Sequence, residues 1–237
     1  MQYQQNLIAA TLVKRYKRFL ADVILSDGSS LTVHVPNTGS LMGCVEPGLE
    51  VRLSDSHNRD RKYRFTLEQV VLEQSRVGVN THHANQLVGE ALEAGLIPSL
   101  RAFTSRRAEV KYGQEKSRID WLLKDEMGHS CYVEVKNVSA AVAGRVGVFP
   151  DAPSERATKH CRELIRIVNE GQRAAIIFCV QRSDVEVVEP AQIIDPHYTQ
   201  ALIEAEQSGV ELYALRANLS DEGVQLVDAV PVRCPPK

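Results

Sequence analysis

Alternating apolar and polar residues mark the first third of the chain. Leu31, Val33 and Val35 alternate with polar residues, as do Val51 and Leu53, and further apolar or β-branched runs occupy residues 7–13, 19–25 and 63–72. Such alternation predicts short, half-buried β-strands, and Ser26-Asp27-Gly28-Ser29 predicts a turn between two of them. About five strands over residues 7–75 favour a small β-barrel of the OB type, and a small SH3-like barrel fits nearly as well.

The spacing of the apolar residues changes after Val79. Apolar residues from Ala84 to Leu92 repeat at helical intervals, with Asn80 or Thr81 as the expected N-cap and Gly95 as the end of the helix. A second helix has an apolar stripe from Ala157 to Val168. Strands are expected between and after these helices, over residues 108–112, 118–124, 130–138 and 174–180, with a short strand over 185–188. An extension follows, with a helix over 196–208 and strands over 210–215 and 224–230.

The resulting element order predicts two domains. An OB-like barrel over residues 1–78 is followed by an α-β-β-β-α-β domain over residues 79–237, so the fold class is α/β in the broad sense that includes α+β. Hydrophobic residues make up 43% of the 237 residues and charged residues 24%, which is an ordinary globular composition.

Several classes of protein are disfavoured. No apolar run approaches the roughly 20 residues that span a bilayer, and the N-terminus lacks the pattern of a signal peptide. The five cysteines are far apart, with no C-x-x-C pair that would indicate a thiolate zinc site. No glycine-rich phosphate-binding motif is present, so no nucleotide cofactor is expected. We therefore expect a cytoplasmic protein that has no membrane partner.

Charge is distributed unevenly. Residues 1–182 contain 25 basic and 20 acidic residues, whereas residues 183–237 contain 3 and 10. A basic body followed by an acidic section suggests a polyanionic partner for the first part. Ordinary fluctuation of charge along a chain is the explanation that this pattern alone favours, so the pattern does not decide the partner.

The segment from Ser117 to Lys136 contains the strongest chemical signal. Asp120 lies seven residues before Met127 and Glu134 lies seven residues after it. A hairpin centred on Met127 therefore places the two side chains directly opposite each other, on the same face. Lys136 shares that face because it lies two residues beyond Glu134. Two opposed carboxylates repel each other unless a cation neutralises them, and hard oxygen ligands suit Mg²⁺ or Mn²⁺.

This spacing is the pattern of the PD-(D/E)XK nuclease core. In that core the carboxylates hold metal and the lysine stabilises charge on the phosphate. Glu90, on the first helix, is the candidate for a further acidic ligand. The predicted catalytic set is thus Asp120, Glu134, Lys136 and Glu90, of which Asp120, Glu134 and Glu90 are the metal ligands. The alternative is a solvent-facing hairpin that has one Glu-Lys pair.

Basic residues of the predicted barrel form two clusters. Lys14, Arg15, Lys17 and Arg18 lie within KRYKRF, and on a strand Arg15, Lys17 and Phe19 would face one way. Arg59, Arg61 and Lys62 form the second cluster. A basic and aromatic barrel face suits a nucleic-acid backbone, although charge also protects an edge strand from aggregation. Near the start of the second helix, Lys159 and the adjacent His160 are placed to approach a phosphate.

The sequence also resembles the bacterial sugar fermentation stimulation protein A family along nearly its whole length. The motifs that carry the resemblance are KRYKRFLADV (14–23), PNTGS (36–40), VNTHHAN (79–85), EVKYG (109–113), SRIDWLL (117–123), CYVEVKNV (131–138), FPDAPSER (149–156), KHCREL (159–164) and EGQRA (170–174). The resemblance implies an OB-like domain, a PD-(D/E)XK-like domain, non-specific DNA binding and a regulatory role in sugar metabolism.

Two hypotheses follow. In the first, the protein binds DNA and its site is a working, metal-dependent phosphodiesterase. In the second, it is a DNA-binding regulatory module that retains the nuclease fold without chemistry. DNA is the expected partner, and the sequence leaves RNA and homo-oligomerisation open.

Overall fold

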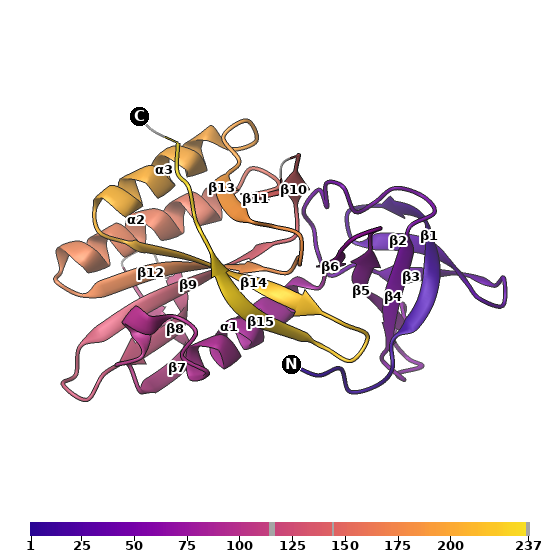
Figure 1. The fold of residues 1–237 in the computed structure, drawn as a ribbon, viewed down its shortest axis with the longest axis horizontal. Helices are drawn as coiled ribbons and strands as arrows, with labels where there is room; N and C mark the ends of the chain where they lie inside the picture. Colours follow the sequence, from indigo (N-terminus) through magenta and orange to yellow (C-terminus); the bar gives the residue numbers. More distant parts are fainter. Residues whose placement is uncertain (114–116, 144, 236–237) are drawn as a thin grey trace.

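The computed structural model describes residues 1–113, 117–143 and 145–235, and it consists of a β-barrel packed against a mixed α/β domain (Figure 1). The barrel sheet has the strand order β3-β2-β1-β4-β5-β6, and a pairing between β3 and β5 closes it. Its strands are β1 (Ile8–Tyr16), β2 (Leu20–Leu25), β3 (Ser30–His34), β4 (Glu50–Asp55), β5 (Phe65–Val71) and β6 (Arg76–Gly78). The predicted OB-like barrel is confirmed.

The basic stretch of the barrel differs from its prediction. β1 ends at Tyr16, and Lys17 and Arg18 have φ angles of 50° and 66° in the turn before β2. The expected alternation of faces along a strand was therefore wrong for these two residues. Because a turn carries side chains outward, Lys17 and Arg18 are exposed at the end of the barrel.

The α/β domain is built on a second six-stranded sheet, of order β15-β14-β12-β9-β8-β7. β12 pairs in parallel with β9 and β14, whereas the remaining neighbours are antiparallel. The strands are β7 (Ser105–Tyr112), β8 (Ser117–Lys124), β9 (Ser130–Val138), β12 (Arg173–Val180), β14 (Glu211–Leu219) and β15 (Val224–Val230). The expected α-β-β-β-α-β order is present.

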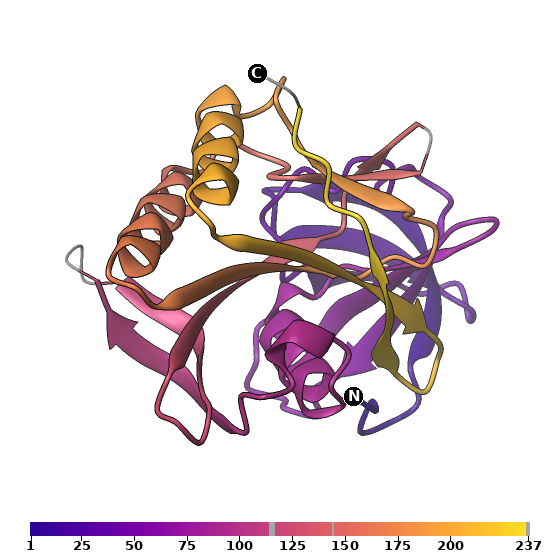
Figure 2. The same cartoon turned by 60° about the vertical axis from the view of Figure 1, so that its left-hand side comes forward.

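Helices cover both faces of this sheet (Figure 2). α2 (Glu155–Asn169) and α3 (Pro196–Gln207) pack on one face, and α1 (Ala84–Glu93) packs on the other, preceded by the 3-10 turn η1 (Thr81–His83) and followed by η2 (Pro98–Leu100). The Asn80 side chain accepts a hydrogen bond from the backbone N–H of His82 and so caps η1, as its sequence position predicts. No helix in the described ranges is long and apolar enough to cross a membrane.

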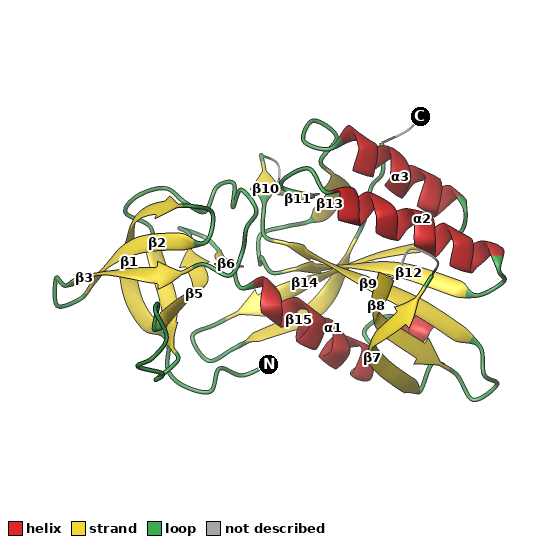
Figure 3. Cartoon of the chain, turned by 180° about the vertical axis from the view of Figure 1, so that it is seen from behind, coloured by secondary structure: helices red, strands yellow, loops and turns green. Residues whose placement is uncertain are grey.

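A small third sheet lies near the barrel. It consists of β10 (Ala141–Val142), β11 (Val146–Phe149) and β13 (Val187–Pro190), of which the sequence indicated only β13. β10 and β11 lie toward the barrel side of the domain, where the two parts of the chain meet (Figure 3).

Buried polar contacts join the barrel to the α/β domain. The N–H of Gly78 donates to the Gln181 carbonyl at 2.8 Å, and the Asn37 side-chain amide donates to Ser139 Oγ at 3.1 Å. The N-terminal segment also crosses between the two parts, because Gln2 forms a β-bridge with Gly223. Since buried polar groups are costly to leave unpaired, these bonds fix the position of the barrel.

Burial on β12 leads to a stability prediction. Ile176 packs in the core under α2 and α3, Ile177 packs in the core under α1, and both are fully buried. We expect Ile176→Ala and Ile177→Ala each to lower the free energy of unfolding by about 2–5 kcal/mol. The matched control Ile193→Ala, at a fully exposed isoleucine, should change it by less than about 0.5 kcal/mol. Urea unfolding measures all three, and an equal effect at Ile193 would contradict the assigned cores.

Candidate metal and nucleic-acid site

The hairpin of β8 and β9 has the predicted register but ends its pairing early. Trp121 lies opposite Val133 and Lys124 opposite Ser130, so the centre is Met127 as expected. Pairing stops at Trp121, although β9 continues alongside β12 as far as Val138. The two strands therefore separate where Asp120 and Glu134 lie, and the backbone N–H of Val135 is left without a partner in β8.

Asp120 fills this gap with its side chain. Its Oδ2 accepts from the Val135 N–H at 2.7 Å, and its Oδ1 accepts from the Asn85 amide of α1 at 3.0 Å. Burial and then the nearby Glu134 carboxylate raise the pKa of Asp120, and these effects outweigh the two hydrogen bonds. An ionised Asp120 is therefore held in a place that disfavours its negative charge.

Glu134 lies on the α2 side of β9 and is 3% exposed. Its Oε1 accepts from the Lys136 ammonium at 2.9 Å and contacts His160 Nδ1 of α2. Burial alone would raise the pKa of Glu134, but Lys136 and His160 together hold it below its ordinary value. Within the described residues its other oxygen, Oε2, is buried and has no hydrogen-bond partner.

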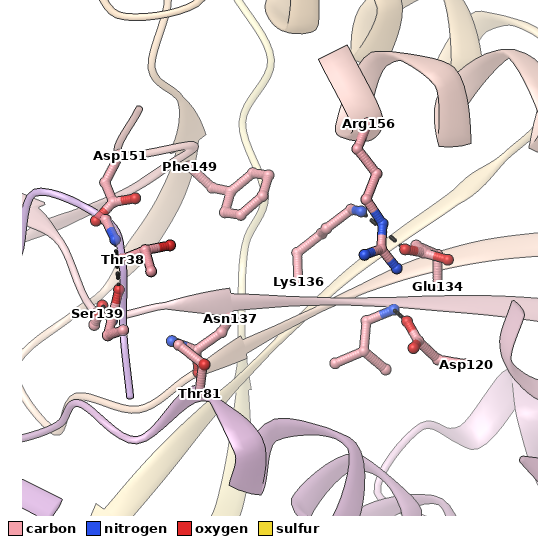
Figure 4. Close-up of a pocket in the computed structure, with 13 residues that line it drawn as sticks. Thr38, Thr81, Asp120, Glu134, Lys136, Asn137, Ser139, Phe149, Asp151 and Arg156 are labelled. Carbon is pink, nitrogen blue, oxygen red and sulfur yellow. Dashed lines mark hydrogen bonds and ion pairs between the residues drawn. The ribbon is translucent and has the colours of Figure 1, made fainter. Parts of the chain in front are cut away.

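The two carboxylates do not lie side by side on one face, as the symmetric hairpin predicted. Figure 4 shows them on either side of the β9 ribbon, with Asp120 against the Val135 N–H and Glu134 toward Lys136. The reason is the early end of the pairing, which lets the Asp120 side chain turn to the β9 backbone. Both still line one cavity of about 300 Å³.

This cavity lies between the barrel and the α/β domain. Asp120, Glu134 and Lys136 line it, and so does the loop from Asn37 to Gly39 that follows β3, called the barrel loop below. Its other walls come from the start of η1, the end of β9 and the segment from β11 to α2, namely Thr81, Val135, Asn137, Ser139, Phe149, Asp151 and Arg156. Arg156, in the first turn of α2, extends toward Glu134 (Figure 4). Within the described residues Arg156 forms no ion pair, so its guanidinium group is available to a ligand beside the carboxylates.

Glu90 is not part of this cavity. Its Oε2 forms an ion pair with the N-terminal ammonium at 2.6 Å, and it lines a different cavity together with Met1, Gln2 and residues of β15. Asn85, not Glu90, is the α1 residue that reaches Asp120. The structure thus does not bring the predicted third acidic ligand to the site.

The first basic cluster of the barrel has two kinds of member. The Arg15 guanidinium donates to the carbonyls of Asn37, Gly39 and Ser40 at 2.7–3.0 Å, and Arg18 donates to the Thr38 carbonyl at 2.7 Å. These arginines therefore hold the loop that forms one wall of the cavity. Lys14, by contrast, is exposed, with its ammonium group 3.5 Å from the Asp22 carboxylate, and Lys17 is exposed in the turn.

The remaining predicted contacts lie away from the carboxylates. Arg59, Arg61 and Lys62 are exposed in the loop between β4 and β5, and Arg61 is close enough to His34 to help burial lower the pKa of that histidine. Lys159 is half-buried on α2, whereas its neighbour His160 is buried and contacts Glu134. Of these two helix residues, His160 is the one in the site.

Sequence reasoning did not assign Arg156, Asn85 or the barrel loop to the site, and it placed His160 only near a phosphate. One signal was available, because Arg156 and His160 are four residues apart and share a helix face. The contribution of Asn37, Thr38 and Gly39 had no such signal, since it depends on how the barrel packs against the α/β domain.

The donor set fits a divalent cation. The carboxylates of half-buried Asp120 and buried Glu134 line the cavity, and Glu134 Oε2 has no partner among the described residues. No group of three or more His, Cys, Asp or Glu side chains suited to a metal occurs in the described part of the chain. Two carboxylates without a third suit a cation that keeps water ligands, as Mg²⁺ usually does.

Comparison with known proteins decides the family. The model of the SfsA N-terminal OB domain matches residues 13–79, and that of the sugar fermentation stimulation protein RE domain matches residues 82–223. The chain belongs to the sugar fermentation stimulation protein family. It is 52% identical to the homolog from Thioalkalivibrio sulfidiphilus, over 95% of each chain, and 50% identical to that from Teredinibacter turnerae, over 98% of this chain and 99% of the relative.

A solved structure shares the whole fold. Pyrococcus furiosus SfsA in complex with Ca²⁺ superposes with a TM-score of 0.86 over 98% of both chains, at 26% sequence identity. The resemblance found in the sequence motifs is therefore confirmed, and both the barrel and the α/β domain are features of this family.

The raised pKa of Asp120 leads to a prediction for the protein without divalent cations. A carboxyl group whose pKa is higher in the folded than in the unfolded protein binds more protons when folded. The stability of the fold therefore falls as the pH rises above 3.8, the ordinary pKa of an aspartate. Asp120→Asn removes this penalty and keeps an acceptor for the Val135 N–H. At pH 7 we expect a higher melting temperature than in the unsubstituted protein, by about 2–4 °C for each kcal/mol of repulsion relieved.

Thermal melts in a chelating buffer between pH 3 and pH 8 measure the difference, which should shrink toward pH 3. Glu126→Gln, at an exposed carboxylate in the turn of the same hairpin, is the matched control and should leave the melting temperature unchanged. A lower melting temperature for Asp120→Asn at pH 7 would contradict the repulsion argued from the geometry.

Proposed function

We propose that this protein binds DNA without sequence specificity and hydrolyses phosphodiester bonds at a site that needs Mg²⁺ or Mn²⁺. The observation that carries the proposal is the pair of half-buried Asp120 and buried Glu134, with the unpartnered Glu134 Oε2, beside Lys136 and Arg156 in one cavity. Acidic oxygens and basic side chains in one place suit a divalent cation and a phosphate together.

Each residue has a distinct part in this proposal. Asp120 and Glu134 would hold the divalent cation, which when bound supplies Lewis acidity and an activated water. Lys136 and His160 both contact Glu134 Oε1, so they orient its other oxygen toward the cavity. Arg156 binds the phosphate as a bidentate donor, and Lys136 stabilises the charge that develops on it.

Two further observations support the proposal. The related Pyrococcus furiosus protein was solved in complex with Ca²⁺, an ion that prefers the same oxygen ligands. The barrel presents exposed Lys14 and Lys17 at one end, and small barrels of this type bind nucleic acids through basic faces.

A non-catalytic DNA-binding module is the second candidate. One observation favours it: Lys136 and His160 already neutralise Glu134 without a metal. In either case we propose a cytoplasmic protein, since all five cysteines are free, with a regulatory role in sugar metabolism in keeping with the names of its relatives.

Cleavage tests the enzymatic proposal. We expect the protein with Mn²⁺ to cleave DNA, and Lys136→Ala to reduce the single-turnover rate about a hundredfold or more, as for other preorganised charge donors. Lys136→Arg should not restore it, because a planar guanidinium does not replace a compact ammonium. Glu134→Gln should also be inactive, whereas Lys124→Ala, at an exposed lysine on the same hairpin, should cleave normally.

Filter binding on the same variants separates the two candidates. DNA affinity should fall only slightly in Lys136→Ala, since one phosphate contact among many is lost. Binding without any metal-dependent cleavage by the unsubstituted protein would reject the nuclease and leave the binding module.

Salt dependence tests the barrel as the DNA-binding surface. Lys14→Ala with Lys17→Ala removes two exposed charges that hold no loop in place. The slope of log affinity against log salt should become shallower by up to about 0.9 for each lost contact with duplex DNA. Lys124→Ala, outside the barrel, is the control and should keep the slope. An unchanged slope in the double variant would show that these lysines only protect the barrel surface.

A further inference from the structure

We propose that the cavity takes one unpaired nucleotide, so that the protein acts on single-stranded DNA or on a base turned out of the duplex. Its phosphate would lie toward Lys136 and Arg156, and its base between Phe149 and the barrel loop from Asn37 to Gly39. This inference rests on the proposed function and specifies the substrate of the same site.

The size of the cavity supports a single nucleotide. Its volume is about 300 Å³, at the small end of the roughly 300–1,000 Å³ range of small-molecule sites. It is bounded by the barrel loop on one side and by the start of α2 on the other (Figure 4). Two stacked base pairs do not fit between such walls, whereas one extruded base does.

The chemistry of the cavity changes from one end to the other. At the α2 end are Lys136 and Arg156, which suit a phosphate. At the barrel end are the Asp151 carboxylate and the Asn37 side chain, which bonds Ser139 Oγ at 3.1 Å. A carboxylate there disfavours a second phosphate and favours the N–H and O–H donors of a base or sugar.

Two side chains between these ends suit a base. Phe149 is fixed by edge contacts to Phe178 and Tyr198, with ring centroids 5.9 and 5.3 Å away, and its ring lies 6.0 Å from the Lys136 ammonium. An aromatic ring held in this way offers a stacking surface to any base. Asn137 uses its Oδ1 to accept from Gln181 at 2.6 Å, which leaves its amide N–H groups for a ligand.

The barrel loop is held in place before any substrate binds. Arg15 and Arg18 bond four of its backbone carbonyls, in residues 37–40. The loop also packs closely against the α/β domain, since a Cβ added to Gly39 would lie 1.9 Å from Asp151 Oδ2. This wall therefore excludes a paired duplex from the carboxylates unless a nucleotide leaves the stack.

The test compares three ligands in Ca²⁺: a ten-nucleotide thymidine strand, a strand of ten abasic residues with the same charge, and a blunt duplex of ten base pairs. We expect the thymidine strand to bind at least tenfold more tightly than the abasic strand. Thr38→Trp, at an exposed residue on the cavity wall, should remove this difference, because the larger side chain takes the place of the base.

Two controls locate the base. Thr11→Trp, at an exposed threonine on β1, should keep the tenfold difference. Phe19→Ser should also keep it, because Phe19 is the exposed aromatic of the basic turn and would be the stacking residue if bases bound there instead. If Phe19→Ser removes the difference and Thr38→Trp does not, the base binds on the barrel and the inference is wrong.

The outcomes separate the inference from the proposed function. Equal binding of the thymidine and abasic strands overturns the inference while DNA binding stands. Binding to none of the three ligands overturns the proposed function itself.

Discussion

The site depends on the point at which β8 stops pairing with β9. β9 is bonded to β12 along its length. It therefore stays in the sheet beyond the last β8–β9 pair, Trp121 with Val133, while β8 moves away. This leaves the Val135 N–H unpaired in the interior, where a missing hydrogen bond costs about 1–3 kcal/mol. Asp120 supplies the acceptor, and in doing so brings a second, half-buried carboxylate close to Glu134.

Balancing those charges involves both faces of the sheet. Asn85 from α1 supports Asp120, and His160 from α2 supports Glu134 together with Lys136. Each supporting group satisfies one carboxylate oxygen, and Glu134 Oε2 is the acceptor that the described residues leave without a partner. A buried charged group is costly to leave without a partner, and Glu134 is the one described residue with such an atom that also lines this cavity, which is why the oxygen points to a ligand.

The barrel contributes to the site as well as to the surface. Arg15 and Arg18 belong to the basic motif that suggested nucleic-acid binding, but their guanidinium groups bond the carbonyls of the loop at the cavity wall. A change in this turn would therefore affect both the surface charge of the barrel and the shape of the cavity. The two domains act on one site because their interface contains buried polar contacts, among them those of Arg182 with Cys44 and Val77 of the barrel.

The sequence by itself determined the order of the helices and of the strands in the two large sheets, a small N-terminal barrel, the hairpin centre at Met127 and the closeness of Asp120, Glu134 and Lys136. These follow from local periodicity, which acts over a few residues and can be read along the chain. Tertiary structure decided the rest. Glu90 and Asn85 are five residues apart, about 140° around a helix, and only the packing of α1 shows that Asn85 faces Asp120 while Glu90 faces the N-terminus. His160, Arg156 and the loop from Asn37 to Gly39 reach the carboxylates through contacts between distant segments, which no local pattern records.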